Sequence, residues 1–134
     1  MEAQSRPCFA KTTKQNELRK LPKKNPKYGL LVDYEYCTGC HTCELACKQE
    51  FHRLTGMGGI KVIDILQELP RGKLYPTFIP FPTELCVQCM HRVREGKKPA
   101  CVQHCMTSCL TFGPIEKLAR LQTKKPRTVL WAPR

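Results

Sequence analysis

The chain has 134 residues, of which 23 are lysine or arginine, 11 aspartate or glutamate and 10 cysteine, and its formal net charge is +12. This length suits one small domain with extensions, and an apolar content of 41% leaves one modest core, which excludes a large self-sufficient enzyme. No run approaches the roughly 18 apolar residues of a membrane span, and the N-terminus shows neither a signal-peptide segment nor a twin arginine. We therefore expect a cytoplasmic protein whose cysteines serve metal binding rather than disulfides.

The basic residues are concentrated at the two ends of the chain. Residues 1–28 carry a net charge of +6 and residues 114–134 carry +5, whereas residues 29–113 carry +1 and nine of the ten cysteines. We expect a basic N-terminal arm over 1–28, a core domain over 29–113, and a C-terminal helix with an extended tail over 114–134. Apolar residues among the charges favour arms that wrap an acidic partner surface, and the alternative is a pair of solvated tails.

The core is expected to contain short elements. Apolar residues that alternate with polar ones, or that form a short run, predict strands, and apolar residues three or four positions apart predict helices. Glycine or proline marks the end of an element. In chain order we expect a strand over 28–33, a helix over 44–53, a hairpin of strands over 60–69 and 74–81, a strand over 110–113, a helix over 115–121 and an extended segment over 128–133.

Four cysteines lie within eleven residues, with the spacing C-x2-C-x2-C-x3-C: Cys37, Cys40, Cys43 and Cys47. This is the spacing that bacterial ferredoxins use for a 4Fe-4S cluster. Three of the thiolates can reach one cluster from a single tight loop, in which Gly39 relaxes the backbone, and the fourth points toward a second cluster. Zinc sites usually separate two C-x2-C pairs by a dozen or more residues, so the spacing favours iron–sulfur over zinc.

A second set of cysteines has the spacing C-x2-C-x11-C-x3-C: Cys86, Cys89, Cys101 and Cys105. In two-cluster ferredoxins the last cysteine of each set binds the other cluster. The predicted ligands are therefore Cys37, Cys40, Cys43 and Cys105 for cluster 1, and Cys86, Cys89, Cys101 and Cys47 for cluster 2. The order of elements around these loops predicts an α+β, ferredoxin-like fold with two 4Fe-4S clusters and pseudo-twofold symmetry, flanked by basic arms. Cluster binding should be inseparable from folding.

Two cysteines remain outside this assignment, and two histidines adjoin it. Cys109 lies four residues after Cys105 and is the alternative fourth ligand of cluster 1, or else a small buried residue beside it. Cys8, in the N-terminal arm, is interpreted as a free thiol. His41 and His104 each adjoin a predicted ligand, and can either donate hydrogen bonds that raise a cluster potential or simply line the surface.

The second cysteine set is part of a longer motif. Residues 86–105 read CVQCMHRVREGKKPACVQHC, and LTFGPI follows at 110–115. This resembles the last cysteine group of the iron–sulfur subunits of dimethyl-sulfoxide-reductase-type molybdopterin enzymes, and residues 37–47 resemble the first group. The family has four such groups; here a glycine-rich turn and hairpin over 54–82 replace the middle two. Met106 stands where the family usually has proline, and Cys109 stands where the family usually has a small residue such as alanine.

The resemblance implies a non-catalytic subunit that relays electrons through two 4Fe-4S clusters to or from a molybdenum or tungsten pterin catalytic subunit, which the basic arms contact. Two clusters favour a soluble redox partner over a membrane quinone. The alternative to a cytoplasmic location is export together with a partner subunit that bears a signal. The alternatives are a free-standing ferredoxin, although free ferredoxins are usually acidic and compact, and a subunit of a flavin oxidoreductase. A zinc-dependent nucleic-acid-binding module, suggested by the basic ends, is the least favoured function.

Overall fold

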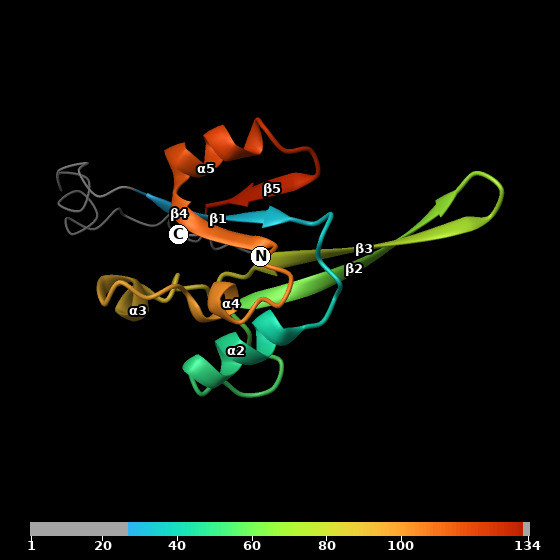
Figure 1. Cartoon of the computed structure of the whole chain (residues 1–134). Helices are drawn as coiled ribbons and strands as arrows, with labels where there is room; N and C mark the ends of the chain where they lie inside the picture. Colours follow the sequence, from blue (N-terminus) through green and yellow to red (C-terminus); the bar gives the residue numbers. More distant parts are fainter. Residues whose placement is uncertain (1–26, 133–134) are drawn as a thin grey trace, which may run out of the picture.

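The computed structural model describes residues 27–132, which combine short helices with two antiparallel sheets (Figure 1). The elements are β1 (Tyr28–Asp33), α2 (Thr42–Glu50), β2 (Ile60–Leu69), β3 (Lys73–Pro82), α3 (Met90–Arg94), α4 (Ala100–Gln103), β4 (Leu110–Pro114), α5 (Ile115–Gln122) and β5 (Thr128–Trp131). This mixture is consistent with the predicted α+β, ferredoxin-like class. The predicted arm over residues 1–28, with Cys8, falls almost entirely outside the described residues.

A three-stranded sheet in the order β4-β1-β5 forms the centre of the fold. β1 pairs antiparallel with both neighbours, and its apolar run Leu30, Leu31 and Val32 is buried, because both of its faces are covered. α5 follows β4 directly and packs Leu118, only 2% exposed, on this sheet. The predicted strands at 28–33 and 110–113 are thus present, the second one residue longer.

The C-terminal segment contains the predicted helix, as α5, and the predicted extended segment, as β5, which is paired with the central sheet. β5 pairs with β1 along Leu30 to Asp33, and Trp131 packs edge-on against Phe81 at 4.8 Å. These contacts partly bury the apolar side chains of the TVLW sequence, which a solvated tail would expose. Residues 115–131 therefore pack on and pair with the central sheet.

The β2–β3 hairpin forms a separate two-stranded sheet. β2 has the predicted bounds, and β3 extends one residue further at each end than predicted. The base of the hairpin is buried, with Ile60 at 1% exposure, whereas its far end projects beyond the rest of the molecule (Figure 1).

The helices beside the cysteines are shorter than the pattern suggested. α2 occupies 42–50 instead of 44–53, because left-handed backbone at His41 (φ 57°) and His52 (φ 48°) bounds it on both sides. α3 and α4 have only five and four residues, too short for a helical period to be visible in the sequence.

Candidate metal centres

The predicted ligands of cluster 2 line a single cavity. Cys47 comes from α2, Cys86 and Cys89 from the loop that leads into α3, and Cys101 from α4. The remaining walls are mostly apolar and include Ile60 and Phe112. The second C-x2-C loop is tightly wound, with left-handed backbone at both Gln88 (φ 56°) and Cys89 (φ 49°). Four thiols from three separate segments therefore face one largely apolar space.

A buried cationic group lies beside this cavity. Arg53 donates a hydrogen bond from Nη2 to the Leu85 carbonyl at 2.8 Å, but its Nη1 is buried without a partner among the described residues. A Cβ atom on Gly59 would lie 2.9 Å from Cys47 Sγ and 3.1 Å from Arg53 Nη1, so only glycine leaves room at this wall. An unpaired buried guanidinium nitrogen beside a thiol is costly by itself and suits an anionic group held by thiolates. The donor set and this orphan nitrogen therefore fit a 4Fe-4S cluster.

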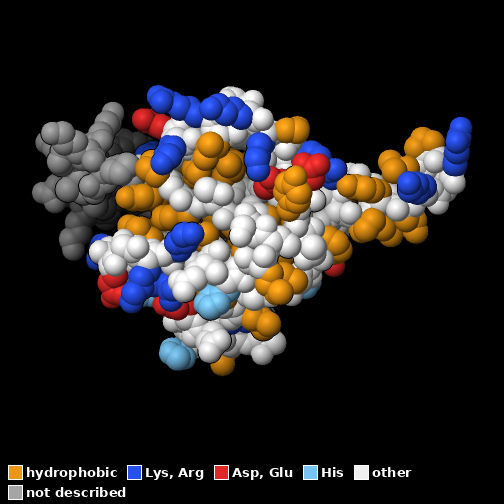
Figure 2. Space-filling view, in the orientation of Figure 1, with side chains coloured by type: hydrophobic (Ala, Val, Ile, Leu, Met, Phe, Trp, Pro, Cys, Tyr) orange, Lys and Arg blue, Asp and Glu red, His pale blue; other side chains and the backbone are white. Residues whose placement is uncertain are grey.

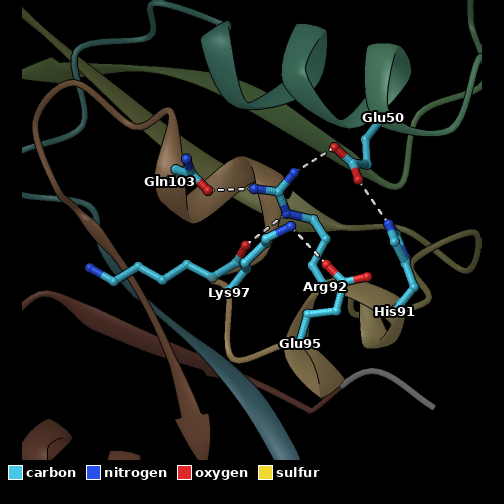
Figure 3. Close-up of polar contacts among 7 residues, drawn as sticks. Glu50, His91, Arg92, Glu95, Lys97 and Gln103 are labelled. Carbon is cyan, nitrogen blue, oxygen red and sulfur yellow. Dashed lines mark hydrogen bonds and ion pairs between the residues drawn. The ribbon is translucent and has the colours of Figure 1, made fainter.

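A polar network around Arg92 joins the segments that surround the cluster 2 cavity (Figure 3). The guanidinium donates to Glu50 Oε2 at 2.8 Å, to the Lys98 carbonyl at 3.0 Å and to the Gln103 side chain. His91 Nε2 bonds the other Glu50 oxygen at 2.8 Å. The pKa of Glu50 is lowered by the hydrogen bond from His91 and by that from Arg92. α2, α3 and α4 are thereby fastened together.

The predicted ligands of cluster 1 line a second, smaller cavity, which Cys109 also lines. The set comprises Cys37, Cys40, Cys43 and Cys105. Cys109 is 4% exposed, and its Sγ lies 3.5 Å from that of Cys105. The structure thus brings all four predicted ligands to one cavity together with their predicted competitor, and both cysteines stay candidates for the fourth position.

Gly39 and Glu44 shape the loop of cluster 1. Gly39 has φ +68°, and a Cβ there would lie 2.6 Å from Phe78 Cδ1, so this residue needs both the left-handed backbone and the absence of a side chain. Glu44 Oε1 accepts a hydrogen bond from the Val62 amide at 2.6 Å and contacts His41 Nδ1 at 3.3 Å. The helix after the loop is thereby attached to β2 of the hairpin.

Burial dominates the acidity of the cysteine thiols. It raises the pKa of Cys43 to about 12 and raises the pKa values of Cys86, Cys89, Cys101 and Cys109 above the ordinary value. Cys40 is exposed, and a hydrogen bond from the Thr42 side chain lowers its pKa. At Cys105 burial acts to raise the pKa, but hydrogen bonds from Thr107 and Cys109 outweigh it and lower the pKa. Metal ligation must remove the protons of the buried thiols.

The histidines and the residues missed in the sequence complete the surroundings of the two cavities. His41 lines the cluster 1 cavity but its ring faces Glu44, whereas His104 lines an exposed hollow beside α2.

Sequence reasoning missed Arg53, Gly59 and Glu50, because their roles arise from contacts between distant segments. Arg92 was visible only as part of the longer motif over residues 86–105. No three His, Cys, Asp or Glu side chains within residues 27–132 are grouped to hold a single metal ion.

Comparison with known proteins decides the family. A family description of the 4Fe-4S dicluster domain matches residues 36–110, more than half of the chain. The chain belongs to this family. The matched range begins one residue before Cys37 and ends one residue after Cys109, so the dicluster domain includes every cysteine that lines the two cavities.

Individual relatives are iron–sulfur subunits of oxidoreductases. The B subunit of the anaerobic dimethyl sulfoxide reductase of Escherichia coli is 31% identical over 91 residues, which are 68% of this chain and 34% of that protein. YnfG of the same organism, named as part of a probable anaerobic dimethyl sulfoxide reductase, is 32% identical over 89 residues (66% and 33%). The iron–sulfur cluster-binding subunit of menaquinone reductase from Nitratidesulfovibrio vulgaris is 31% identical over 88 residues (59% and 31%).

These matches confirm the resemblance to iron–sulfur subunits of dimethyl-sulfoxide-reductase-type enzymes. The chain spans about a third of the length of these relatives. No helix within residues 27–132 has the length and apolar character of a membrane span.

Proposed function

We propose that this chain is a non-catalytic subunit that relays electrons through two 4Fe-4S clusters to or from a molybdenum or tungsten pterin catalytic subunit. The observation that carries the proposal is the exchange of cysteines between the two sets. Cys47 faces the cavity of the second set, and Cys105 faces the cavity of the first. This crossed arrangement is the ligation pattern of two-cluster ferredoxins.

The residues of the chain have distinct roles in this proposal. Cys37, Cys40, Cys43 and Cys105 hold cluster 1, and Cys47, Cys86, Cys89 and Cys101 hold cluster 2. Bound in this way, each cluster accepts and donates one electron. The buried apolar side chains Leu110 and Ile60 exclude water from the cavities, and the unpaired Arg53 nitrogen stabilises negative charge beside Cys47. The exposed Cys40 is a point at which electrons can pass to or from another protein.

The partner, its contacts and the location are part of the same proposal. The catalytic subunit is inferred from the dimethyl sulfoxide reductase relatives, and the basic residues of 1–28 are proposed to contact it. A soluble protein is proposed as the second redox partner, with the complex in the cytoplasm or exported through a signal on the catalytic subunit.

The test is anaerobic purification of the tagged full-length chain from its native host. We expect a brown protein with broad absorbance near 400 nm, about eight irons per chain and no zinc, together with a large subunit that contains molybdenum or tungsten and pterin. A colourless, zinc-loaded protein would contradict the clusters. A brown chain that migrates alone by size exclusion would favour the free-standing ferredoxin, and a co-purifying flavoprotein would favour the flavin oxidoreductase.

A further inference from the structure

The β2–β3 hairpin has one edge blocked by proline. Three prolines lie at even-numbered positions of β3, and the register pairs each with an even-numbered residue of β2: Pro76 with Leu66, Pro80 with Val62, and Pro82 with Ile60. Proline has no N–H and cannot donate a hydrogen bond to the partner strand. The even-numbered residues of both strands are therefore those whose backbone N–H and C=O groups face away from the partner strand. On the β3 side this leaves the outer edge poor in donors, which is how proteins protect an edge strand.

Two hydrogen bonds support this parity independently. The amide of Val62, an even-numbered residue, donates to Glu44 Oε1 at 2.6 Å, outside the hairpin. At the base of the hairpin, the amide of the odd-numbered Thr83 donates to the Gly59 carbonyl across the two strands at 3.0 Å. The outward amides and carbonyls of β2 beyond Val62 are therefore those of Asp64, Leu66 and Glu68, and β2 contains no proline. The outer edge of β2 is a template for another strand.

The side chains beside this edge are apolar and exposed. Leu66 is 65% exposed and Leu74 57% on one face of the hairpin, and Ile63 is 45% exposed on the other. Figure 2 shows hydrophobic side chains along the projecting arm, which Figure 1 shows extending away from the helices. A two-stranded hairpin with apolar residues on both faces is at best marginally stable in water, so this arm is suited to a partner that covers it.

The hairpin is nevertheless held at a defined position on the core. Arg127, just before β5, lies between the rings of Tyr34 and Tyr75, 5.4 Å from each centroid, and donates to the Tyr75 hydroxyl at 3.0 Å. This contact fastens β3 at Tyr75, near the hairpin turn, to the C-terminal segment, and a fixed edge loses less conformational freedom on binding.

We propose that the outer edge of β2 accepts an extended strand of the catalytic subunit, with basic side chains opposite Asp64 and Glu68. Neither carboxylate forms an ion pair within residues 27–132, and both lie on the same face as Leu66. The partner strand therefore carries two basic residues that flank an apolar one, and its backbone completes a three-stranded sheet. The inference rests on the proposed function, which supplies the partner.

A second copy of this chain fits the edge less well. The free stretch of β2 runs from residue 63 to residue 69, and antiparallel pairing of two such stretches is centred on Leu66. That register sets Asp64 of each copy opposite Glu68 of the other, and like charges directly opposite destabilise a strand pair.

The first test compares proline on the two edges, in the full-length chain co-expressed with its large subunit. Leu66→Pro and Leu74→Pro each remove an outward amide that the hairpin does not use, so both variants should keep the wild-type iron content. We expect Leu66→Pro to weaken the complex at least about tenfold, and Leu74→Pro less than about twofold. Equal effects of the two variants, or an intact complex with Leu66→Pro, would overturn the proposal.

The second test needs no variant and covers the case in which Leu66→Pro fails to fold. Residue-resolved amide exchange is measured for the cluster-loaded chain alone and in the complex. We expect the amides of Asp64, Leu66 and Glu68 to exchange at least about tenfold more slowly in the complex. Unchanged exchange in an intact complex overturns the strand addition and leaves the proposed function standing. Protection in the chain alone, rising with its concentration, identifies a second copy instead. Absence of any large subunit overturns both proposals.

Discussion

The guanidinium of Arg92 lies 2.8 Å from the carboxylate of Glu50, and this ion pair joins segments that are 42 residues apart in the chain. Glu50 ends α2, three residues after Cys47, and Arg92 lies three residues after Cys89. The same guanidinium reaches Gln103 at the end of α4, two residues after Cys101. One side chain thus holds together the three segments that carry the proposed ligands of cluster 2.

Removal of this side chain should damage cluster 2 selectively. We expect Arg92→Ala to lose the bonds to Gln103 and to the Lys98 carbonyl, at about 1 kcal/mol each, and iron to fall from about eight to about four per chain. The matched control is Lys97→Ala, because Lys97 forms an exposed ion pair with Glu95, at 2.7 Å, of the kind that contributes little. Iron analysis and electron paramagnetic resonance measure the outcome. Equal loss of both clusters would contradict the selective role.

Acid should weaken the same network. The pKa of Glu50 lies below its ordinary value because His91 and Arg92 donate hydrogen bonds to it. A carboxyl group whose pKa is lowered by folding stabilises the fold above its unfolded pKa, and loses that contribution as the pH falls through the folded pKa. We therefore expect the Tm of the wild type to fall more steeply between about pH 5 and pH 3 than that of Glu50→Gln. Parallel Tm profiles would show that Glu50 is not linked to stability.

The first cysteine loop should not tolerate a side chain at Gly39. Gly39→Ala adds the cost of left-handed backbone, about 1–2 kcal/mol, and brings a methyl group 2.6 Å from the Phe78 ring. We expect loss of cluster 1 with cluster 2 retained. Gly56→Ala is the control, because Gly56 also has positive φ but nothing lies within 4 Å of the added methyl. Iron content should stay normal in this control, and Gly39→Ala,Phe78→Ala should recover part of the loss.

The cysteine groups and the strands around them could be predicted because their signals are local. The two spacings, Gly39 and the alternation of residues 60–69 act over a few neighbouring residues, and the structure forms a strand at 60–69 and brings each predicted set to one cavity. The exchange of Cys47 and Cys105 was predicted from the ligation rule of two-cluster ferredoxins, and each of these cysteines lines the cavity to which that rule assigns it.

Other features depend on contacts that no local pattern contains. The TVLW segment has the composition of a strand, but only its pairing with β1 makes it part of the core instead of a tail. Arg53 was only the last residue of the helix predicted over 44–53, and its role arises from the approach of Gly59 and Leu85. The choice between Cys105 and Cys109 was open because both lie within reach of one cavity, and their sulfurs are 3.5 Å apart.

The unpaired nitrogen of Arg53 should influence the potential of cluster 2. Its positive charge favours the reduced state, which carries one more negative charge, so its removal should lower the potential. We expect Arg53→Gln to lower the cluster 2 potential by on the order of 50 mV and Arg53→Lys to lower it less. Redox titration followed by electron paramagnetic resonance separates the two clusters. Unchanged potentials in Arg53→Gln with full iron content would exclude a role in tuning.

The fourth ligand of cluster 1 can be identified by two single substitutions. Cys105 is half-buried, and hydrogen bonds from Thr107 and Cys109 lower its pKa, whereas burial raises the pKa of Cys109. Cys101-x3-Cys105 repeats the spacing of Cys43-x3-Cys47, which favours Cys105 as the ligand. We therefore expect Cys105→Ala to lose cluster 1, leaving about four irons, and Cys109→Ala to retain about eight. The reverse result would assign Cys109 as the ligand. If each single variant keeps both clusters and only Cys105→Ala,Cys109→Ala loses one, the two neighbouring thiols substitute for each other.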